Sequence, residues 1–431
     1  MAQRRHGPQS SIVAETIAVG SELIVGGRSD SNSCFIVDQL GLLGIEARYK
    51  TIVGDDESDI ATELRSAAKR ACIIVVTGGL GPTVDDLTRE AVARATGRKL
   101  ARRKEALDAV KSRLALWGRV PNAGQRRQGL VPTGATVIGN PVGSAPGFWM
   151  VWHRVILFVL PGVPREMEAM MKEGVVPVLQ AYLQQRRRVS QPLSRQVFHI
   201  YGLAESEVDE RLSGIVPHGA AIDLGLLAAP SGVLVSLTTN GKKNLSSSEL
   251  NGYADELRLR LKDWIFAEGD HTMEEVVGRA LTELDLTVAV AESCTGGLIG
   301  HRLTQVPGSS SYFERGVICY SNRAKVELLG VPADTIEQFG AVSSEVAAAM
   351  AQGICERSRA SLGLSVTGIA GPGGATPNKP VGLVYIGLYE QNGNSVTKEY
   401  RFHGDRSVIK QRASQAALDM LRRWCKDRTV A

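Results

Sequence analysis

A serine and a lysine in the last third of the chain have the types and spacing for nucleophilic catalysis. Ser293 lies in residues 291–297 (AESCTGG), and Lys325 ends residues 320–325 (YSNRAK). A serine hydroxyl is a weak nucleophile until a base takes its proton, and a lysine amine can be that base when burial lowers its pKa toward neutrality. We therefore expect a Ser293–Lys325 dyad, with the hydroxyl of Tyr320 bridging the two.

The segment around Ser293 also offers a rival nucleophile and several backbone donors. Cys294 is the rival, because thiols are better nucleophiles than hydroxyls. We expect Thr295, Gly296 and Gly297 to lie at a helix N-terminus, where their N–H groups can hold an oxyanion or a phosphate. One turn between a strand and a helix would then carry both the nucleophile and its donors.

Two further segments carry groups that could bind a substrate. Residues 365–374 (SVTGIAGPGG) supply the Thr367 hydroxyl and a glycine-rich run of backbone donors. Arg406 comes just before the last predicted helix, and it could clamp a phosphate or equally form a surface ion pair. These groups would suit an anionic small molecule.

A second set of loops, in the first third of the chain, could bind phosphates. Residues 77–88 (TGGLGPTVDDLT) lie between a predicted buried strand and a helix, and their glycines expose backbone N–H groups. Asp85 and Asp86 could hold a hard divalent cation against a pyrophosphate, or could stabilise the N-terminus of the next helix. Glu22 could be a surface carboxylate or a binding group. Asn140 could likewise be a turn residue or a binding group.

The elements that would position these first loops alternate along the chain. Apolar runs and helical spacing predict strands at residues 14–19, 47–53, 72–77 and 155–160, with helices at 32–43, 56–70, 87–95 and from 165. Residues 72–77 (CIIVVT) are continuously apolar, as strands inside a parallel sheet are. This alternation predicts a doubly wound α/β domain.

The rest of the chain predicts a small α+β module and a second α/β unit. Residues 195–262 have the pattern strand, helix, strand, strand, helix, with a turn at residues 240–241. An arginine run at 186–188 precedes the module and is expected to be solvated. The last part predicts strands at 286–291, 316–320, 362–366 and 381–388, and helices at 273–284 and 408–424.

Composition narrows the class of protein. Hydrophobic residues make up 43% of the chain and the net charge is +5, a weak excess that does not argue for nucleic-acid binding. The six cysteines lack metal-ligand spacing and are expected to be reduced thiols. The basic first ten residues are expected to form a disordered tail, and no signal peptide or apolar run of about 18 residues is found. We expect a cytoplasmic protein that does not bind membranes.

Five motifs together resemble the C-terminal domain of the CinA family. In chain order they are AESCTGG, YSNRAK, GAVSSE at 340–345, SVTGIAGPGG and KPVG at 379–382. The resemblance implies that this domain, without a cofactor, hydrolyses the carboxamide of nicotinamide mononucleotide (NMN) to nicotinic acid mononucleotide and ammonia. It implies Ser293 as the nucleophile, Lys325 as the general base, and Tyr320 and Thr367 as supporting hydroxyls. The implied substrate-binding residues are Thr295, Gly296, Gly297, Asn322, Gly371, Gly373, Gly374 and Arg406.

Two motifs near the start resemble the N-terminal, MoaB/Mog-like branch of the same family. They are GGLGPTVDDLT and LPGVPREM at 160–167, and Ser21 and Ser144 stand where that branch has threonine. The resemblance implies an ADP-ribose pyrophosphatase that needs Mg, Mn or Co, with potassium as a further ion, and Asp85 and Asp86 as the metal ligands. The implied substrate-binding residues are Gly20, Glu22, Asn32, Gly78, Gly79, Gly81, Asp85, Asn140, Pro161 and Gly162.

The resemblance implies three domains: a MoaB/Mog-like domain at 11–175, a KH-type α+β linker at 176–265 and a CinA amidohydrolase domain at 270–431. The linker lacks the G-x-x-G loop of nucleic-acid-binding KH domains. We therefore expect a spacer or dimerisation element, no direct nucleic-acid contact, and a homodimer. Two alternatives remain: the N-terminal domain only binds a nucleotide or molybdopterin-like ligand, or the protein regulates competence or the response to DNA damage.

Overall fold

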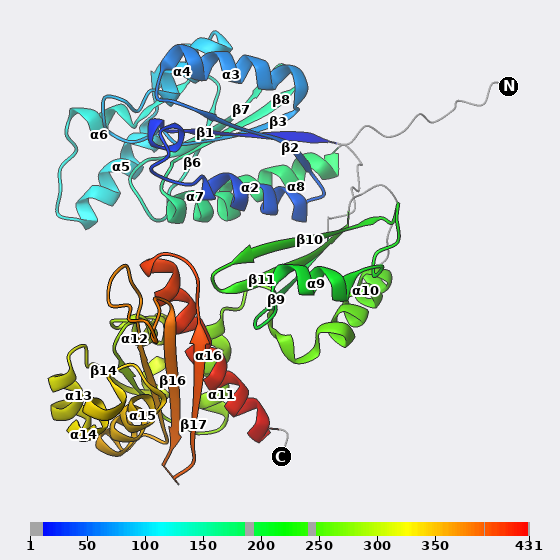
Figure 1. Cartoon of the computed structure of the whole chain (residues 1–431). Coiled ribbons are helices and arrows are strands. Elements are labelled where there is room, and N and C mark those ends of the chain that lie inside the picture. The colour runs from blue at the N-terminus through cyan, green and yellow to red at the C-terminus, as the bar shows by residue number, and fades with distance from the viewer. Residues whose placement is uncertain (1–11, 186–193, 240–246, 392, 430–431) are drawn as a thin grey trace. The chain divides into compact units, whose positions relative to one another are not determined.

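The computed structural model describes residues 12–185, 194–239, 247–391 and 393–429. They form two compact units, one ending at Ser194 and one beginning at Arg195 (Figure 1). The expected N-terminal tail, the arginine run at 186–188 and the turn at 240–241 lie outside the described residues. Within the described part, every helix is too short or too polar to cross a bilayer.

The first unit is built on a six-stranded sheet with the order β2-β1-β3-β8-β7-β6. The four parallel strands are those predicted from the sequence: β1 (Val13–Val19), β2 (Glu46–Val53), β3 (Ile73–Thr77) and β8 (Val155–Leu160). The antiparallel strands β7 (Gly147–Trp152) and β6 (Thr136–Ile138) were not predicted. The sheet is therefore mixed, with an antiparallel hairpin added at one edge.

Helices cover both faces of this sheet, which explains the continuous apolar runs. Ile74 and Val76 of β3 join one core cluster, while Ile73 and Val75 join the other. In Figure 1, α3 (Glu57–Arg70) and α4 (Thr88–Thr96) cover one face, and α2 (Ser31–Leu42), α7 (Pro164–Met170) and α8 (Val176–Gln185) cover the opposite face. The smaller elements are α1 (Ser21–Ile24), β4 (Leu100–Arg102), α5 (Lys104–Leu116), α6 (Ala123–Arg127), β5 (Leu130–Pro132) and the π-helical turn Met171–Val175.

The second unit begins with the α+β module. Its elements are β9 (Arg195–Ile200), α9 (Glu205–Leu212), β10 (Ile222–Ala229), β11 (Gly232–Thr239), α10 (Ser247–Leu261) and β12 (Ile265–Glu268), with a short 3-10 turn at Lys262–Trp264. The predicted element order is confirmed. The additional strand β12 pairs with β9, so the antiparallel sheet has the order β10-β11-β9-β12.

The rest of the second unit is a five-stranded sheet with the order β14-β13-β15-β16-β17. The strands are β13 (Val288–Glu292), β14 (Phe313–Ile318), β15 (Leu362–Gly368), β16 (Leu383–Glu390) and β17 (Ser395–Arg401). The first three in the chain, β13 to β15, are parallel. Because parallel strands end at the same edge of a sheet, the segments after them, which begin at Ser293, Cys319 and Ile369, come together there.

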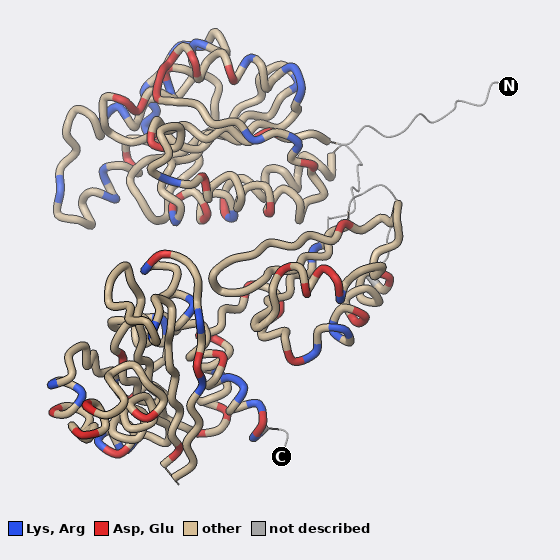
Figure 2. The backbone as a smooth tube through the Cα atoms, in the orientation of Figure 1, with Lys and Arg blue, Asp and Glu red and all other residues tan. Residues whose placement is uncertain are grey.

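Helices again cover both faces of the sheet. The helices α11 (Met273–Glu283), α12 (Leu298–Gln305) and α16 (Arg406–Thr429) share one core cluster, and α13 (Asn322–Leu329), α14 (Ala333–Phe339) and α15 (Ser344–Ser358) share the other. Of these helices, α11 and α16 were predicted, although α16 extends beyond the predicted range 408–424 at both ends. Figure 2 shows that acidic and basic residues are interspersed along the helices of both units.

Candidate functional site

Ser293 and Lys325 meet at the carboxyl edge of the C-terminal sheet. Ser293 follows the last residue of β13, and Lys325 lies in the first turn of α13, whose start is capped by Ser321. The Lys325 Nζ and Ser293 Oγ atoms are 3.1 Å apart. Both side chains are buried, with exposed fractions of 1% for Lys325 and 8% for Ser293. The expected pair is therefore assembled, and it is shielded from bulk water.

The surroundings of the Lys325 amine favour its neutral form. The amine also donates to the main-chain carbonyls of Cys319 at 2.9 Å and Tyr320 at 3.4 Å, and no carboxylate forms an ion pair with it among the described residues. Burial is the largest influence and lowers the pKa of the amine below its ordinary 10.5. A neutral amine keeps two N–H groups for the two carbonyls and has a lone pair for the serine proton.

A buried carboxylate occupies the helix N-terminus that we expected to bind an anion. Glu292 is 1% exposed and accepts hydrogen bonds from the N–H groups of Gly297 (3.0 Å), Ile299 (3.1 Å) and Gly300 (2.8 Å). The N–H of Gly296 donates to the Ser293 carbonyl at 3.2 Å. The expectation that the Gly296 and Gly297 amides hold an oxyanion or phosphate is therefore wrong, because both already have acceptors.

The two glycines act through their backbone conformation instead. Gly296 and Gly297 have φ angles of +63° and +95°, in the left-handed region that side chains disfavour. This sharp turn lets the chain fold back so that Glu292 caps α12. The adjacent Thr295 is fully buried, and its hydroxyl oxygen has no hydrogen-bond partner within the described structure. The Thr295 hydroxyl is thus a donor that a substrate could use.

Cys294 is poorly suited to be the nucleophile. Its side chain is 5% exposed and belongs to the apolar core cluster on the α16 side of the sheet. Burial raises the pKa of the thiol to about 12. The reactive thiolate is therefore disfavoured at neutral pH.

Tyr320 and Arg406 connect two of the loops at this edge. The Tyr320 hydroxyl accepts a hydrogen bond from Arg406 Nη2 at 2.8 Å, and Arg406 Nη1 donates to the Gly371 carbonyl at 2.7 Å. The Tyr320 side chain is 59% exposed. The hydroxyl is thus bonded to Arg406 and does not bridge the dyad as expected; it is the Tyr320 main-chain carbonyl that contacts Lys325.

The other expected C-terminal residues lie on the same edge of the sheet, and they differ in burial. Thr367 is the last residue but one of β15 and is 1% exposed, and its hydroxyl donates to the Ala341 carbonyl at 2.7 Å. It therefore holds the loop that precedes α15. Asn322, Gly373 and Gly374 are exposed.

Three N-terminal loops also come together, at the carboxyl ends of β1, β3 and β8. Asn32 Nδ2 donates to Thr77 Oγ1 at 3.0 Å and to the Gly162 carbonyl at 2.8 Å, and Thr77 Oγ1 donates to the Pro161 carbonyl at 3.0 Å. A Cβ at Gly162 would lie 3.2 Å from the Cα of Gly78. Asn32 is 8% exposed, and its Oδ1 atom has no partner within the described structure.

The glycines of the 77–88 loop are required by close approaches. A Cβ at Gly78 would lie 2.1 Å from the Val19 carbonyl oxygen, and one at Gly79 would lie 2.1 Å from Thr88 Oγ1. Both residues also have positive φ angles. These glycines therefore allow the tight turn between β3 and α4, as the sequence suggested.

The two aspartates of this loop have different surroundings. Asp86 accepts from the N–H groups of Gly81 and Thr83 at 2.8 Å each and from Thr83 Oγ1, so both of its carboxylate oxygens hold the loop together. Asp85 is exposed, and a hydrogen bond from Thr83 lowers the pKa of its carboxyl group. Among the described residues, no group of three or more His, Cys, Asp or Glu side chains could hold a metal ion.

Asn140 and Glu22 have different surroundings. Asn140 Oδ1 accepts from the N–H groups of Val142 and Gly143, and its Nδ2 donates to the Ala145 carbonyl and to Glu166 in the first turn of α7, so the amide holds its own turn and connects it to α7. Glu22 is exposed on α1, beside Gly20, where a Cβ would lie 2.7 Å from its carboxylate.

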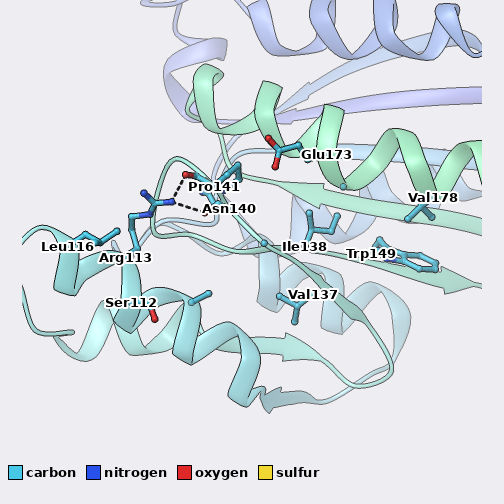
Figure 3. A pocket seen from close by; sticks show the side chains of 13 residues that line it. Ser112, Arg113, Leu116, Val137, Ile138, Asn140, Pro141, Trp149, Glu173 and Val178 are labelled. Carbon is cyan, nitrogen blue, oxygen red and sulfur yellow. Dashed lines mark hydrogen bonds between the residues drawn. The ribbon is translucent and has the colours of Figure 1, made fainter.

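A pocket of about 610 Å³ lies beside the edge strand β6, on the other side of Asn140 (Figure 3). It is lined mainly by α5, β6 and the helical stretch around Glu173. Arg113 reaches across to the main-chain carbonyls of Asn140 and Pro141. Asn140 is the only residue singled out in the sequence that lines this pocket within the described structure, and the glycines of the 77–88 loop do not reach it.

Sequence reasoning missed two residues that organise the C-terminal site. Glu292 stands directly before Ser293, and its acidic type near a predicted helix start was an available signal. Cys319 contacts Lys325 through its main-chain carbonyl, for which side-chain type gives no signal.

Comparison with known proteins gives matches over most of the chain. Three family models match: "CinA C-terminal domain" over residues 270–425, "Probable molybdopterin binding domain" over 15–181, and "Damage-inducible protein CinA KH domain" over 195–267. A "CinA-like protein" of Geotalea uraniireducens is 40% identical over 409 residues, which cover 95% of this chain and 96% of that protein.

Solved structures of shorter proteins are also similar. The competence/damage inducible protein CihA of Agrobacterium tumefaciens is 46% identical, covering 35% of this chain and 93% of that one, with a TM-score of 0.34. CinA of Thermoplasma acidophilum, whose function is described as unknown, is 31% identical and covers 41% and 98%, with a TM-score of 0.36. The full-length similarity to the Geotalea protein shows that the chain belongs to the CinA family.

Proposed function

We propose that the C-terminal part of this chain is an amidohydrolase that converts NMN to nicotinic acid mononucleotide and ammonia. The observation that supports this most directly is the 3.1 Å contact between Ser293 Oγ and the buried Lys325 amine. A nucleophile beside a base whose pKa is lowered by burial is the arrangement that acyl-transfer chemistry needs. The CinA family resemblance supplies the substrate.

The proposed reaction has two halves. Ser293 Oγ attacks the carboxamide carbon while the neutral Lys325 amine takes the hydroxyl proton. The tetrahedral intermediate then breaks its C–N bond, and the protonated Lys325 gives that proton to the departing ammonia. A water molecule, deprotonated by Lys325, attacks the resulting ester and releases the carboxylic acid and the free serine. The Thr295 hydroxyl, buried without a partner, is the side-chain donor available to stabilise the developing negative charge.

Ammonia release from NMN tests this function. Wild-type protein should release ammonia, and Ser293→Ala should lower kcat by at least about a thousand-fold. Cys294→Ser is the matched control, because it changes the neighbouring nucleophilic side chain and should stay active. Activity retained in Ser293→Ala would remove the serine mechanism, and activity lost only in Cys294→Ser would transfer the role to the thiol.

For the N-terminal part we propose ADP-ribose as the ligand and its pyrophosphate bond as the point of cleavage. The supporting observation is the junction of three loops at Asn32, where a buried amide oxygen lacks a partner. Ligands of open α/β sheets bind at such junctions. Binding of a nucleotide or molybdopterin-like ligand without cleavage is the second possibility, and assays of AMP release and of ADP-ribose binding separate the two.

The residues present fit a metal only in part. Asp86 is committed to the loop, so it does not suit the role expected of it. Asp85 is exposed and could contact a divalent cation that arrives with a pyrophosphate, since Mg²⁺ is commonly held by one or two carboxylates together with substrate phosphates. If cleavage depends on a metal, chelator should abolish AMP release and Asp85→Asn should weaken it. Full turnover in chelator would rule out the metal requirement.

A further inference from the structure

Lys410 is a basic residue beside the nucleophile's turn that the mechanism leaves unused. It lies in the second turn of α16, and its Nζ atom is 3.5 Å from the position that a Cβ on Gly296 would occupy. The side chain is half-buried. In the described part of the structure, the Lys410 amine has neither a hydrogen-bond acceptor nor an ion-pair partner.

The path of α16 explains why Lys410 faces this turn. One turn later in the helix, Ser414 accepts a hydrogen bond from Arg302 of α12 at 2.9 Å. One turn earlier, Arg406 contacts Tyr320 and Gly371. Lys410 lies between these contacts on the same side of α16, because residues four apart share a helix face. The amine therefore points along the site rather than into open solvent.

Arg406 and Lys410 form a pair of like charges without a neutralising carboxylate. Like charges at i and i+4 destabilise a helix slightly, and neither side chain forms an ion pair among the described residues. The terminal nitrogens of Arg406 already donate to Gly371 and Tyr320, whereas all three Lys410 donors are free. Together these groups suit a small dianion.

We propose that Lys410 binds the phosphate monoester of the substrate and thereby selects nucleotides over nucleosides at the Ser293 site. The inference rests on the proposed amidohydrolase function for the identity of the reacting group, but the phosphate subsite is a separate claim. The phosphate displaces no protein contact of Lys410. Arg406 contributes its charge while it continues to tie the Tyr320 and Gly371 loops together.

The experiment compares Lys410→Met with Lys398→Met in the full chain. Lys398 lies on β17 with an exposed side chain, so its variant controls for loss of one positive charge elsewhere in the same unit. Lys410→Met should raise KM for NMN about ten- to hundred-fold, as expected for one charge-assisted hydrogen bond. Its kcat should stay within about threefold, because the phosphate contact is made equally in the bound substrate and in the transition state. With nicotinamide riboside, which has no phosphate, Lys410→Met and wild type should have the same kcat/KM.

A binding measurement separates this inference from the proposed reaction. Calorimetric titration with ribose 5-phosphate, in the Ser293→Ala background, should lose one binding event when Lys410→Met is added and keep it with Lys398→Met. If wild type binds ribose 5-phosphate through Lys410 but never releases ammonia from NMN, the proposed reaction fails and the phosphate subsite stands. If ribose 5-phosphate binding and KM for NMN are both unchanged in Lys410→Met, the phosphate subsite is refuted and the amidohydrolase proposal stands.

Discussion

Replacing Lys325 should reveal whether a neutral amine drives the reaction. Lys325→Met keeps a side chain of similar length without the amine, and Lys325→Arg keeps a charge that cannot be removed in the accessible pH range. Each variant should lower kcat/KM for ammonia release by about a hundred- to ten-thousand-fold, the range of general acid–base catalysis. The Ser293 Oγ to Lys325 Nζ distance of 3.1 Å is within the reach that such proton transfer needs.

The pH dependence follows from the direction of the pKa shift. Burial lowers the pKa of Lys325 below 10.5, so wild-type kcat/KM should rise with pH through that lowered pKa and then level off. Between the lowered pKa and 10.5 the unfolded chain holds a proton that the folded chain lacks. In this window the free energy of unfolding of wild type relative to Lys325→Met should rise by about 1.4 kcal/mol per pH unit. Below the lowered pKa and above 10.5 the difference between the two proteins should be constant.

Two measurements check this reasoning on the same proteins. Ammonia release at a series of pH values gives the kinetic midpoint, and urea unfolding of the residue 195–431 unit gives the stability difference. The midpoint of activity and the lower end of the stability window should coincide. Turnover by Lys325→Arg within tenfold of wild type would refute the base role. A stability difference that does not vary with pH would refute the lowered pKa.

Three further variants test the surrounding contacts. Cys294→Ser should keep kcat within about threefold of wild type, because a thiol whose pKa is raised to about 12 is not the nucleophile; a loss comparable to that of Ser293→Ala would contradict this. Tyr320→Phe should lower kcat/KM less than about tenfold, because it removes only the hydrogen bond to Arg406, and a larger fall would place the hydroxyl in the chemistry. Glu292→Gln should lower the free energy of unfolding by about 1–3 kcal/mol, measured in urea, because the buried carboxylate accepts three N–H groups at the start of α12; an unchanged value would show that these contacts are not stabilising.

The parts of the site that depend on the sheet were predictable from the sequence. The apolar runs that became β13 and β15 indicate buried strands, and the strand predicted at 316–320 overlaps the mostly exposed edge strand β14. Strands that share a direction bring their following loops to one edge. The motif order then places Ser293 and Lys325 at that edge. The N-terminal loops were predictable in the same way, because β1, β3 and β8 are the runs that the apolar pattern identifies.

The details of hydrogen bonding were not predictable from residue type. Glycines after a strand suggested free N–H donors. The left-handed turn at Gly296 and Gly297 instead returns the chain to Glu292, whose carboxylate accepts a hydrogen bond from the Gly297 N–H. Asn140 is a similar case, since its amide already bonds within its own turn and to Glu166. The strands β6 and β17 were missed because short or exposed strands lack a continuous apolar run. β7 (GFWMVW) does have such a run and is mostly buried, so its prediction was possible from the sequence.

The position of the Lys325 amine is set by the strand end and not by the nucleophile. β14 ends at Ile318, so the carbonyls of Cys319 and Tyr320 extend beyond the strand and need donors, which Lys325 supplies. Removing the Ser293 hydroxyl leaves both of these hydrogen bonds in place. A crystal structure of Ser293→Ala should therefore show Lys325 Nζ still within about 3.2 Å of the Cys319 carbonyl oxygen. An amine that turns away in that variant would mean that the serine holds the lysine, and the base would then not be preorganised.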